Sequence, residues 1–159
     1  MSTTANRVDF RRLELRDLNA IEKIERASYR TPWSRSMFAG ELAKPSSISL
    51  GAFDPENAEL LGYLIISRYV DAWHVMNLAV APKHRRKHIA ASLLERLFEV
   101  TTGEGRRGYT LEVRVSNDVA IKLYEQLGFE RRGVRRGYYT DNREDALIMW
   151  RDPAVRAVS

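Results

Sequence analysis

Apolar residues along this chain switch between the spacing of β-strands and the spacing of α-helices. Residues 60–69 and 73–80 are apolar or alternating runs of strand length, whereas apolar residues between 89 and 97 recur on one stripe of a helix. The same patterns predict strands over residues 8–15, 48–53, 60–69, 73–80, 109–115, 129–134 and 146–150. Four predicted helices lie between these strands.

The predicted helices are bounded by capping residues, prolines and glycines. Serine and asparagine satisfy the first free N–H groups of a helix, and the residue before a proline avoids helical angles. Glycine is the usual residue just beyond a helix end. The expected limits are Asp17 to Pro32, Ser34 to Pro45, Arg86 to Thr101 and Asn117 to Gly128.

The order of these elements predicts a mixed α/β (α+β) fold. One strand, two helices and three strands are followed by helices that alternate with strands, which favours a central sheet of about seven strands with helices on both faces. The strand–helix–strand units within residues 73–134 have the form of βαβ crossovers. No repeat or linker interrupts the chain, so we expect one domain over residues 1–159, with a core over 8–152.

A cluster of positive charge follows the predicted strand at 73–80. Residues 83–88 read Lys-His-Arg-Arg-Lys-His and lead into a predicted helix. The first N–H groups of a helix and the positive end of its dipole attract anions, so this turn is a candidate pyrophosphate site. The alternative is a solvated basic turn without a ligand.

Glu112 is the carboxylate that carries most information. Its neighbours Leu111 and Val113 point to the opposite face of the predicted strand. A strand between two crossover helices is expected to be covered on both faces, and a carboxylate there is paired, shifted in pKa or functional. We expect either a catalytic role or an ion pair with Arg114 or with an arginine of residues 131–136.

Five other positions have both a structural and a functional interpretation. Tyr124 lies on the apolar side of its helix, where most tyrosines belong to the core, and Asn117 is a natural helix cap. Trp33, in the turn between two helices, is either a core plug or a ligand contact. Tyr138 and Tyr139 either line a pocket or flank a hairpin.

Composition narrows the function classes. The net charge of +5 is concentrated at residues 83–88 and 131–136, which favours local anion sites. The chain has no cysteine, and its three histidines lack a metal-ligand spacing, so neither disulfides nor a metal are expected. No apolar run is long enough to span a membrane, and the first residues lack the apolar core of a signal peptide, so we expect a cytoplasmic protein.

Several segments together resemble the GNAT superfamily of acetyl-CoA-dependent N-acetyltransferases. Residues 85–90 are similar to the Q/R-x-x-G-x-G/A loop of that family, and the block 111–129 closely resembles its RimI-type branch. Thr-Pro-Trp-Ser at 31–34, Arg-Gly-Tyr-Tyr at 136–139 and Arg-Glu-Asp-Ala at 143–146 extend the likeness. The resemblance implies direct transfer of acetyl from acetyl-CoA to a protein N-terminus, typically the alanine of a small-subunit ribosomal protein.

The resemblance also implies roles for individual residues. Glu112 matches the general base of the RimI-type enzymes and Tyr124 matches their general acid, while Trp33, Tyr138 and Tyr139 would wall the acceptor groove. A monomer or weak dimer without a metal is expected. The residues that would bind acetyl-CoA are Leu78, Ala79, Val80, Arg85, Arg86, Lys87, His88, Ile89, Ala90, Ala91 and Asn117.

His88 departs from the family loop, which has glycine at this position. Glycine allows the backbone to approach a pyrophosphate closely, and a histidine is tolerated there if it adopts right-handed helical angles.

Two other functions remain as alternatives. One is a GNAT enzyme that acetylates lysine side chains or small amines, and the other is a basic ribosome- or RNA-binding module without turnover.

Overall fold

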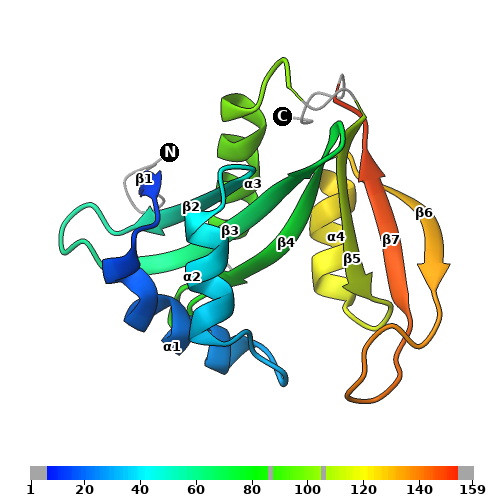
Figure 1. The fold of residues 1–159 in the computed structure, drawn as a ribbon, viewed down its shortest axis with the longest axis horizontal. Helices are drawn as coiled ribbons and strands as arrows, with labels where there is room; N and C mark the ends of the chain where they lie inside the picture. The colour runs from blue at the N-terminus through cyan, green and yellow to red at the C-terminus, as the bar shows by residue number, and fades with distance from the viewer. Residues whose placement is uncertain (1–6, 86–87, 105–106, 154–159) are drawn as a thin grey trace. The chain divides into compact units, whose positions relative to one another are not determined.

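The computed structural model describes residues 7–85, 88–104 and 107–153 (Figure 1). Within these residues the strands are β1 Asp9–Arg12, β2 Ser47–Phe53, β3 Leu60–Tyr69, β4 Ala72–Val80, β5 Gly108–Arg114, β6 Glu130–Arg135 and β7 Ala146–Arg151. The α-helices are α1 Leu18–Ser28, α2 Arg35–Ala43, α3 Ile89–Val100 and α4 Asp118–Gln126. Hydrogen bonds link the strands in the order β1-β2-β3-β4-β5-β7-β6.

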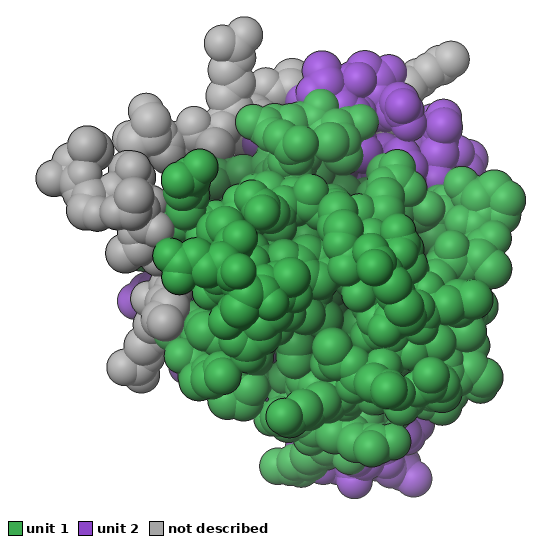
Figure 2. Space-filling model, turned by 90° about the vertical axis from the view of Figure 1, so that its left-hand side faces the viewer, with its two compact units in different colours: residues 1–67, 76–100 green, residues 68–75, 101–159 purple. Residues whose placement is uncertain are grey.

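The chain divides into two compact units, which Figure 2 shows in separate colours. Unit 1 comprises the described residues of 1–67 and 76–100, and unit 2 comprises those of 68–75 and 101–159. The strand β4 contributes residues 72–75 to unit 2 and residues 76–80 to unit 1.

The strands β1, β2 and β3 of unit 1 pair antiparallel with their neighbours. Asp9 of β1 lies opposite Phe53 of β2, and Ser47 of β2 lies opposite Ser67 of β3. The register of this pairing shifts between Ala52 and Phe53. All residues of β2 are buried, as expected for a strand that is covered on both faces.

Helices cover both faces of the unit 1 strands. Tyr63 of β3 belongs to the apolar core that contains Ile24 of α1 and Phe38 of α2. Its neighbour Gly62 faces the other way, where a Cβ would lie 3.3 Å from Ile89 at the start of α3. Because successive residues of a strand face opposite sides, α1 and α2 cover one face and α3 covers the other (Figure 1).

Unit 2 is built on β5. This strand runs parallel to the beginning of β4, with Trp73 opposite Tyr109, and antiparallel to β7, with Leu111 opposite Met149. Burial alternates along β5, so that Leu111 is buried whereas Glu112 lies on the partly exposed face. The strand β6 completes the unit by pairing with β7.

The predicted order of elements and the mixed fold of seven strands are confirmed within the described residues. The prediction of one domain over the whole chain stays a prediction. The prediction that the third helix begins at Arg86 was wrong, because α3 begins at Ile89. Arg86 itself lies outside the described residues. His88, the residue before α3, has a φ of 61°, which lies in the left-handed region. The expectation that a histidine here would adopt right-handed helical angles was therefore wrong.

Replacing His88 with glycine is expected to stabilise the fold by up to about 1 kcal/mol. A side chain in left-handed angles costs about 1–2 kcal/mol, and the greater unfolded-state entropy of glycine offsets part of that gain. Urea unfolding measures the change. Glu95→Gly on the exposed side of α3 is the control and is expected to lose about 1 kcal/mol. Similar losses in both variants would contradict the strain at residue 88.

Candidate active site

The outer edge of β4 in unit 1 presents the backbone groups to which a cofactor arm could pair. The N–H of Ala81 donates to a β3 carbonyl at 2.8 Å. Because the backbone groups of successive residues point to opposite edges of a strand, those of Leu78 and Val80 point away from β3. The Leu78 carbonyl accepts a hydrogen bond from the Tyr29 hydroxyl, and the Val80 carbonyl accepts one from Arg85 Nε at 3.1 Å. Both donors are side-chain groups, which a ligand with N–H groups can replace.

The basic turn after β4 makes contacts with its own unit. Lys83 Nζ lies 3.1 Å from a carboxylate oxygen of Glu59. Arg85 donates through Nη2 to the hydroxyl of Ser28 at 3.0 Å, in addition to its bond with β4. The role of Arg85 in pyrophosphate binding stays a prediction. Arg86 and Lys87, which were predicted to share that role, lie outside the described residues.

The residues at the start of α3, which belong to the predicted pyrophosphate site, differ in burial. His88 is exposed, and its carbonyl accepts hydrogen bonds from both the N–H and the hydroxyl of Ser92, at 3.0 and 2.9 Å. Ile89 is buried, and Ala90 and Ala91 are half-buried. Acetyl-CoA binding by these residues stays a prediction, and His88→Gly is expected to leave that binding intact or tighter.

Glu112 of β5 faces His74 of β4 within unit 2. His74 Nε2 lies 2.7 Å from Glu112 Oε1, and Arg135 Nε lies 3.8 Å from Oε2. The hydrogen bond from His74, together with the charges of His74 and Arg135, outweighs burial and lowers the pKa of Glu112 below its ordinary value of 4.5. At neutral pH the group is therefore a carboxylate, which is the form that can accept a proton.

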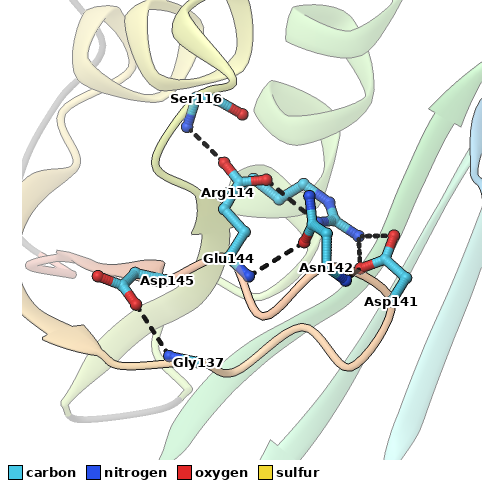
Figure 3. A network of polar contacts seen from close by, with 7 residues as sticks. All are labelled: Arg114, Ser116, Gly137, Asp141, Asn142, Glu144 and Asp145. Carbon is cyan, nitrogen blue, oxygen red and sulfur yellow. Dashed lines mark hydrogen bonds and ion pairs between the residues drawn. The ribbon is translucent and has the colours of Figure 1, made fainter.

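Arg135 supplies the ion pair that was the structural alternative for Glu112, and Arg114 has another role. Its Nη2 donates to both oxygens of Asp141, at 3.0 and 2.9 Å, and its Nη1 donates to Glu144 at 3.1 Å (Figure 3). The Arg114 guanidinium also lies over the Tyr139 ring, 4.0 Å from its centroid. Arg114 thus ties β5 to the β6–β7 loop, which comprises residues 136–145.

Further hydrogen bonds hold the β6–β7 loop at both ends. The N–H of Gly137 donates to Asp145 at 2.8 Å, and the N–H of Ser116 donates to Glu144 at 2.9 Å (Figure 3). The bond from Ser116, followed by those from Arg114 and Asn142, lowers the pKa of Glu144 to about 2. The loop that carries the predicted acceptor residues is therefore fastened to β5 at neutral pH.

Tyr138 and Tyr139 occupy this fastened loop. Their rings meet edge to face with centroids 5.1 Å apart, and Tyr138 is 45% exposed. Burial raises the pKa of Tyr139 to about 12, although the nearby Arg114 acts in the opposite direction. Contact between these tyrosines and an acceptor stays a prediction.

Tyr124 lies on α4 and is buried. Its ring packs against Phe129 with centroids 5.6 Å apart. Burial raises the pKa of Tyr124 above its ordinary value of 10, and Tyr139 adds to the effect. The phenol therefore stays protonated at neutral pH and has a proton to donate. Tyr139 also interacts electrostatically with Glu112, so its charge is coupled to both predicted catalytic residues.

Trp33 and Asn117 have the structural roles that their positions suggested. The Trp33 ring packs against Phe38 with centroids 5.1 Å apart and contacts the unit 1 core. The Asn117 side-chain oxygen accepts the N–H of Ala120 at 3.1 Å and so caps α4. Ligand contacts of either residue stay predictions.

His74 and Tyr29 were not among the residues predicted from sequence. A histidine inside an apolar strand was a signal for His74, but its partner depends on how β4 and β5 align. Tyr29 follows the end of α1, and no pattern in the sequence predicted its role, because its hydrogen bond to Leu78 joins residues that are far apart along the chain.

The sequence profile of the acetyltransferase (GNAT) family matches residues 18–129. The chain belongs to the GNAT family. This GNAT protein is an acetyl-CoA-dependent N-acetyltransferase, and acetyl-CoA is its cosubstrate. Within the part of the chain that the structure describes, no group of three or more histidine, cysteine, aspartate or glutamate side chains is arranged to hold a metal ion.

Relatives of this GNAT enzyme match it over most of their length. A putative [ribosomal protein bS18]-alanine N-acetyltransferase of Bacillus subtilis is 34% identical over 140 residues, which cover 88% of this chain and 92% of the relative. The [ribosomal protein bS18]-alanine N-acetyltransferase of Escherichia coli is 37% identical over 139 residues, with coverages of 86% and 92%.

A solved structure agrees with these matches. The ribosomal-protein-S18-alanine N-acetyltransferase from Escherichia coli superposes with a TM-score of 0.84 at 33% identity, over 95% of this chain and 97% of that chain. The mixed fold of this GNAT enzyme is therefore the fold of that enzyme. None of the helices in the described ranges is long and apolar enough to cross a bilayer.

Glu112→Gln is expected to lower kcat of this GNAT enzyme by about 100-fold or more, because the amide cannot accept the amine proton. The dissociation constant of acetyl-CoA, measured by calorimetry, is expected to change less than twofold. Since the pKa of Glu112 lies below 4.5, its titration is not expected to shape the rate between about pH 6 and pH 9.

Glu130→Gln, on the exposed face of β6, is the control for loss of one carboxylate and is expected to keep wild-type turnover. Unchanged turnover in Glu112→Gln would remove Glu112 as the base.

Proposed function

We propose that this enzyme acetylates the N-terminal α-amine of a ribosomal protein, with an N-terminal alanine as the typical acceptor. The observation that carries the proposal is the identity of 34–37% over most of both chains to enzymes named for that acceptor, ribosomal protein bS18. An acceptor on the ribosome also suggests that the enzyme works in the cytoplasm. The overall charge of +5 suits an acceptor bound to RNA.

The electrostatics around Glu112 support an α-amine as the acceptor. A free α-amine has a pKa of about 7.7–8.0, whereas a lysine side chain has a pKa of about 10.4. Deprotonation at neutral pH therefore costs about 3.5 kcal/mol less for the α-amine. A carboxylate with a lowered pKa is a weak base, and it suits the acceptor that is easier to deprotonate.

The proposed reaction proceeds by direct attack. Glu112 takes one proton from the α-ammonium, directly or through water, and the amine nitrogen forms a bond to the thioester carbonyl carbon. Backbone N–H groups of β4 stabilise the negative charge on the carbonyl oxygen. The carbon–sulfur bond then breaks, and the leaving thiolate takes the proton of Tyr124. The amine loses its second proton, Tyr124 is reprotonated, and one proton is released to solvent.

The proposal gives a role to backbone groups of β4 and to one carboxylate of β5. Leu78 and Val80 of unit 1 would exchange their bonds with Tyr29 and Arg85 for bonds with the pantetheine arm. Glu112 of unit 2 would serve as the base. This assignment is supported by the resemblance of the 111–129 block and by the ionised state of Glu112.

A peptide panel tests the acceptor. We expect kcat/KM for a peptide with a free N-terminal alanine to exceed that for an N-blocked lysine peptide by about 300-fold, the equivalent of the difference in deprotonation. Thiol release from acetyl-CoA measures turnover, and the protein adds no background because it has no cysteine. Preference for the lysine peptide or for a polyamine would contradict the proposal.

Tyr124→Phe is expected to lower the rate of a single turnover by at least about tenfold, because the thiolate loses its proton donor. Tyr109→Phe is the control, since Tyr109 is also a buried tyrosine of unit 2 and contacts Thr101. The control is expected to lose stability and to keep its single-turnover rate. Equal rates in both variants would show that Tyr124 serves only the core.

A further inference from the structure

Glu25 of α1 is a buried carboxyl group that the proposed reaction does not use. Its side chain is 1% exposed, and three donors converge on it. The Tyr63 hydroxyl and Asn77 Nδ2 donate to Oε1, at 2.5 and 2.9 Å, and the backbone N–H of Trp33 donates to Oε2 at 2.9 Å. The donors come from β3, from β4 and from the turn between α1 and α2.

A carboxyl group at this buried position lowers the stability of the core unless its oxygens are hydrogen-bonded. Buried polar groups destabilise a core unless every one of them is hydrogen-bonded, and an apolar side chain of similar size fills such a space without that demand. Unlike an apolar side chain, the carboxyl group makes directional hydrogen bonds, so that each oxygen fixes the position of its donors. Glu25 therefore specifies where the turn lies relative to β4, beyond filling space in the core.

The turn is fastened to β4 at both ends. We call residues 29–34, between α1 and α2, the acceptor turn. At its beginning, the Tyr29 hydroxyl donates to the Leu78 carbonyl. Near its end, Trp33 is connected through Glu25 to Asn77, the residue before Leu78. Two adjacent residues of β4 thus hold the two ends of one turn.

We propose that Glu25 is a positioning residue that fixes the acceptor turn against β4, so that the acceptor peptide binds in register with acetyl-CoA. The inference rests on the proposed function and on the expectation from the family resemblance that Trp33, in the acceptor turn, lines the peptide groove. Glu25 itself contacts neither substrate. Its loss therefore affects acceptor binding more than acetyl-CoA binding.

Two variants separate this role from a contribution to stability alone. In Glu25→Gln the remaining oxygen can keep the two donors Tyr63 and Asn77, and the new amide NH₂ then faces the N–H of Trp33, where two donors repel. The acceptor turn is released selectively. In Tyr63→Phe one donor to Oε1 is lost, whereas the bond to Trp33 remains. Both variants perturb the same buried cluster, and only the first releases the turn.

The kinetic test measures the two substrates separately. For Glu25→Gln we expect KM for the alanine peptide to rise by about tenfold, the scale of a lost and unreplaced hydrogen bond, with the acetyl-CoA dissociation constant within about twofold of wild type. For Tyr63→Phe we expect both constants within about twofold, together with a lower urea midpoint. An unchanged peptide KM in Glu25→Gln, or an equal rise in both variants, overturns the proposal.

Amide hydrogen exchange at Trp33 gives a readout that needs no acceptor. Exchange is expected to be faster in Glu25→Gln and unchanged in Tyr63→Phe, and equal exchange in both overturns the positioning role. If wild-type enzyme acetylates no α-amine peptide, the proposed function fails, while the exchange data still decide the role of Glu25. If Glu25→Gln does not fold, Glu25→Asp replaces it with the same expectations, because the shorter side chain cannot reach all three donors.

Discussion

The hydrogen bond between His74 and Glu112 is the constraint on which the proposed chemistry depends. A glutamate on a half-buried strand has a raised pKa unless something stabilises its charge. His74 supplies that stabilisation from the neighbouring parallel strand, and Arg135 adds to it. The register pairs His74 with Thr110, so His74 shares a face of the sheet with Glu112, which lies two residues further along β5. A small shift in that register would leave the carboxylate without its partner and the proposed reaction without its base.

The same face of β5 carries a second function two residues further along. Arg114 gives its guanidinium to Asp141, Glu144 and the Tyr139 ring, and the β6–β7 loop is held in one arrangement as a result. A loop fixed before substrate arrives binds its ligand without an ordering cost. The arginines of β6 are also engaged, since Arg131 and Arg132 contact Glu125 and Glu130. Such paired charges give little support to an RNA-binding module.

Local features were predictable from the sequence, and long-range partners were not. The strand runs, the caps Ser34 and Asn117 and the order of elements follow from neighbouring residues, and the structure confirms them. The partner of Glu112 depends on strand register, which no spacing in one sequence encodes. Glu25 resembled an ordinary helix residue because its three donors are 8, 38 and 52 residues away. His88 reads as part of a helix, and only its left-handed φ shows where α3 begins.

The most direct test is a measurement of the ionisation of Glu112 itself. Carbon-13 NMR of glutamate-labelled enzyme, with the signal assigned by its loss in Glu112→Gln, follows the carboxyl group through a pH titration. The account predicts a midpoint below 4.5, and a rise of that midpoint when His74 is replaced with glutamine. A midpoint above about 6 would mean that the group is protonated near neutral pH and would contradict Glu112 as a ready base.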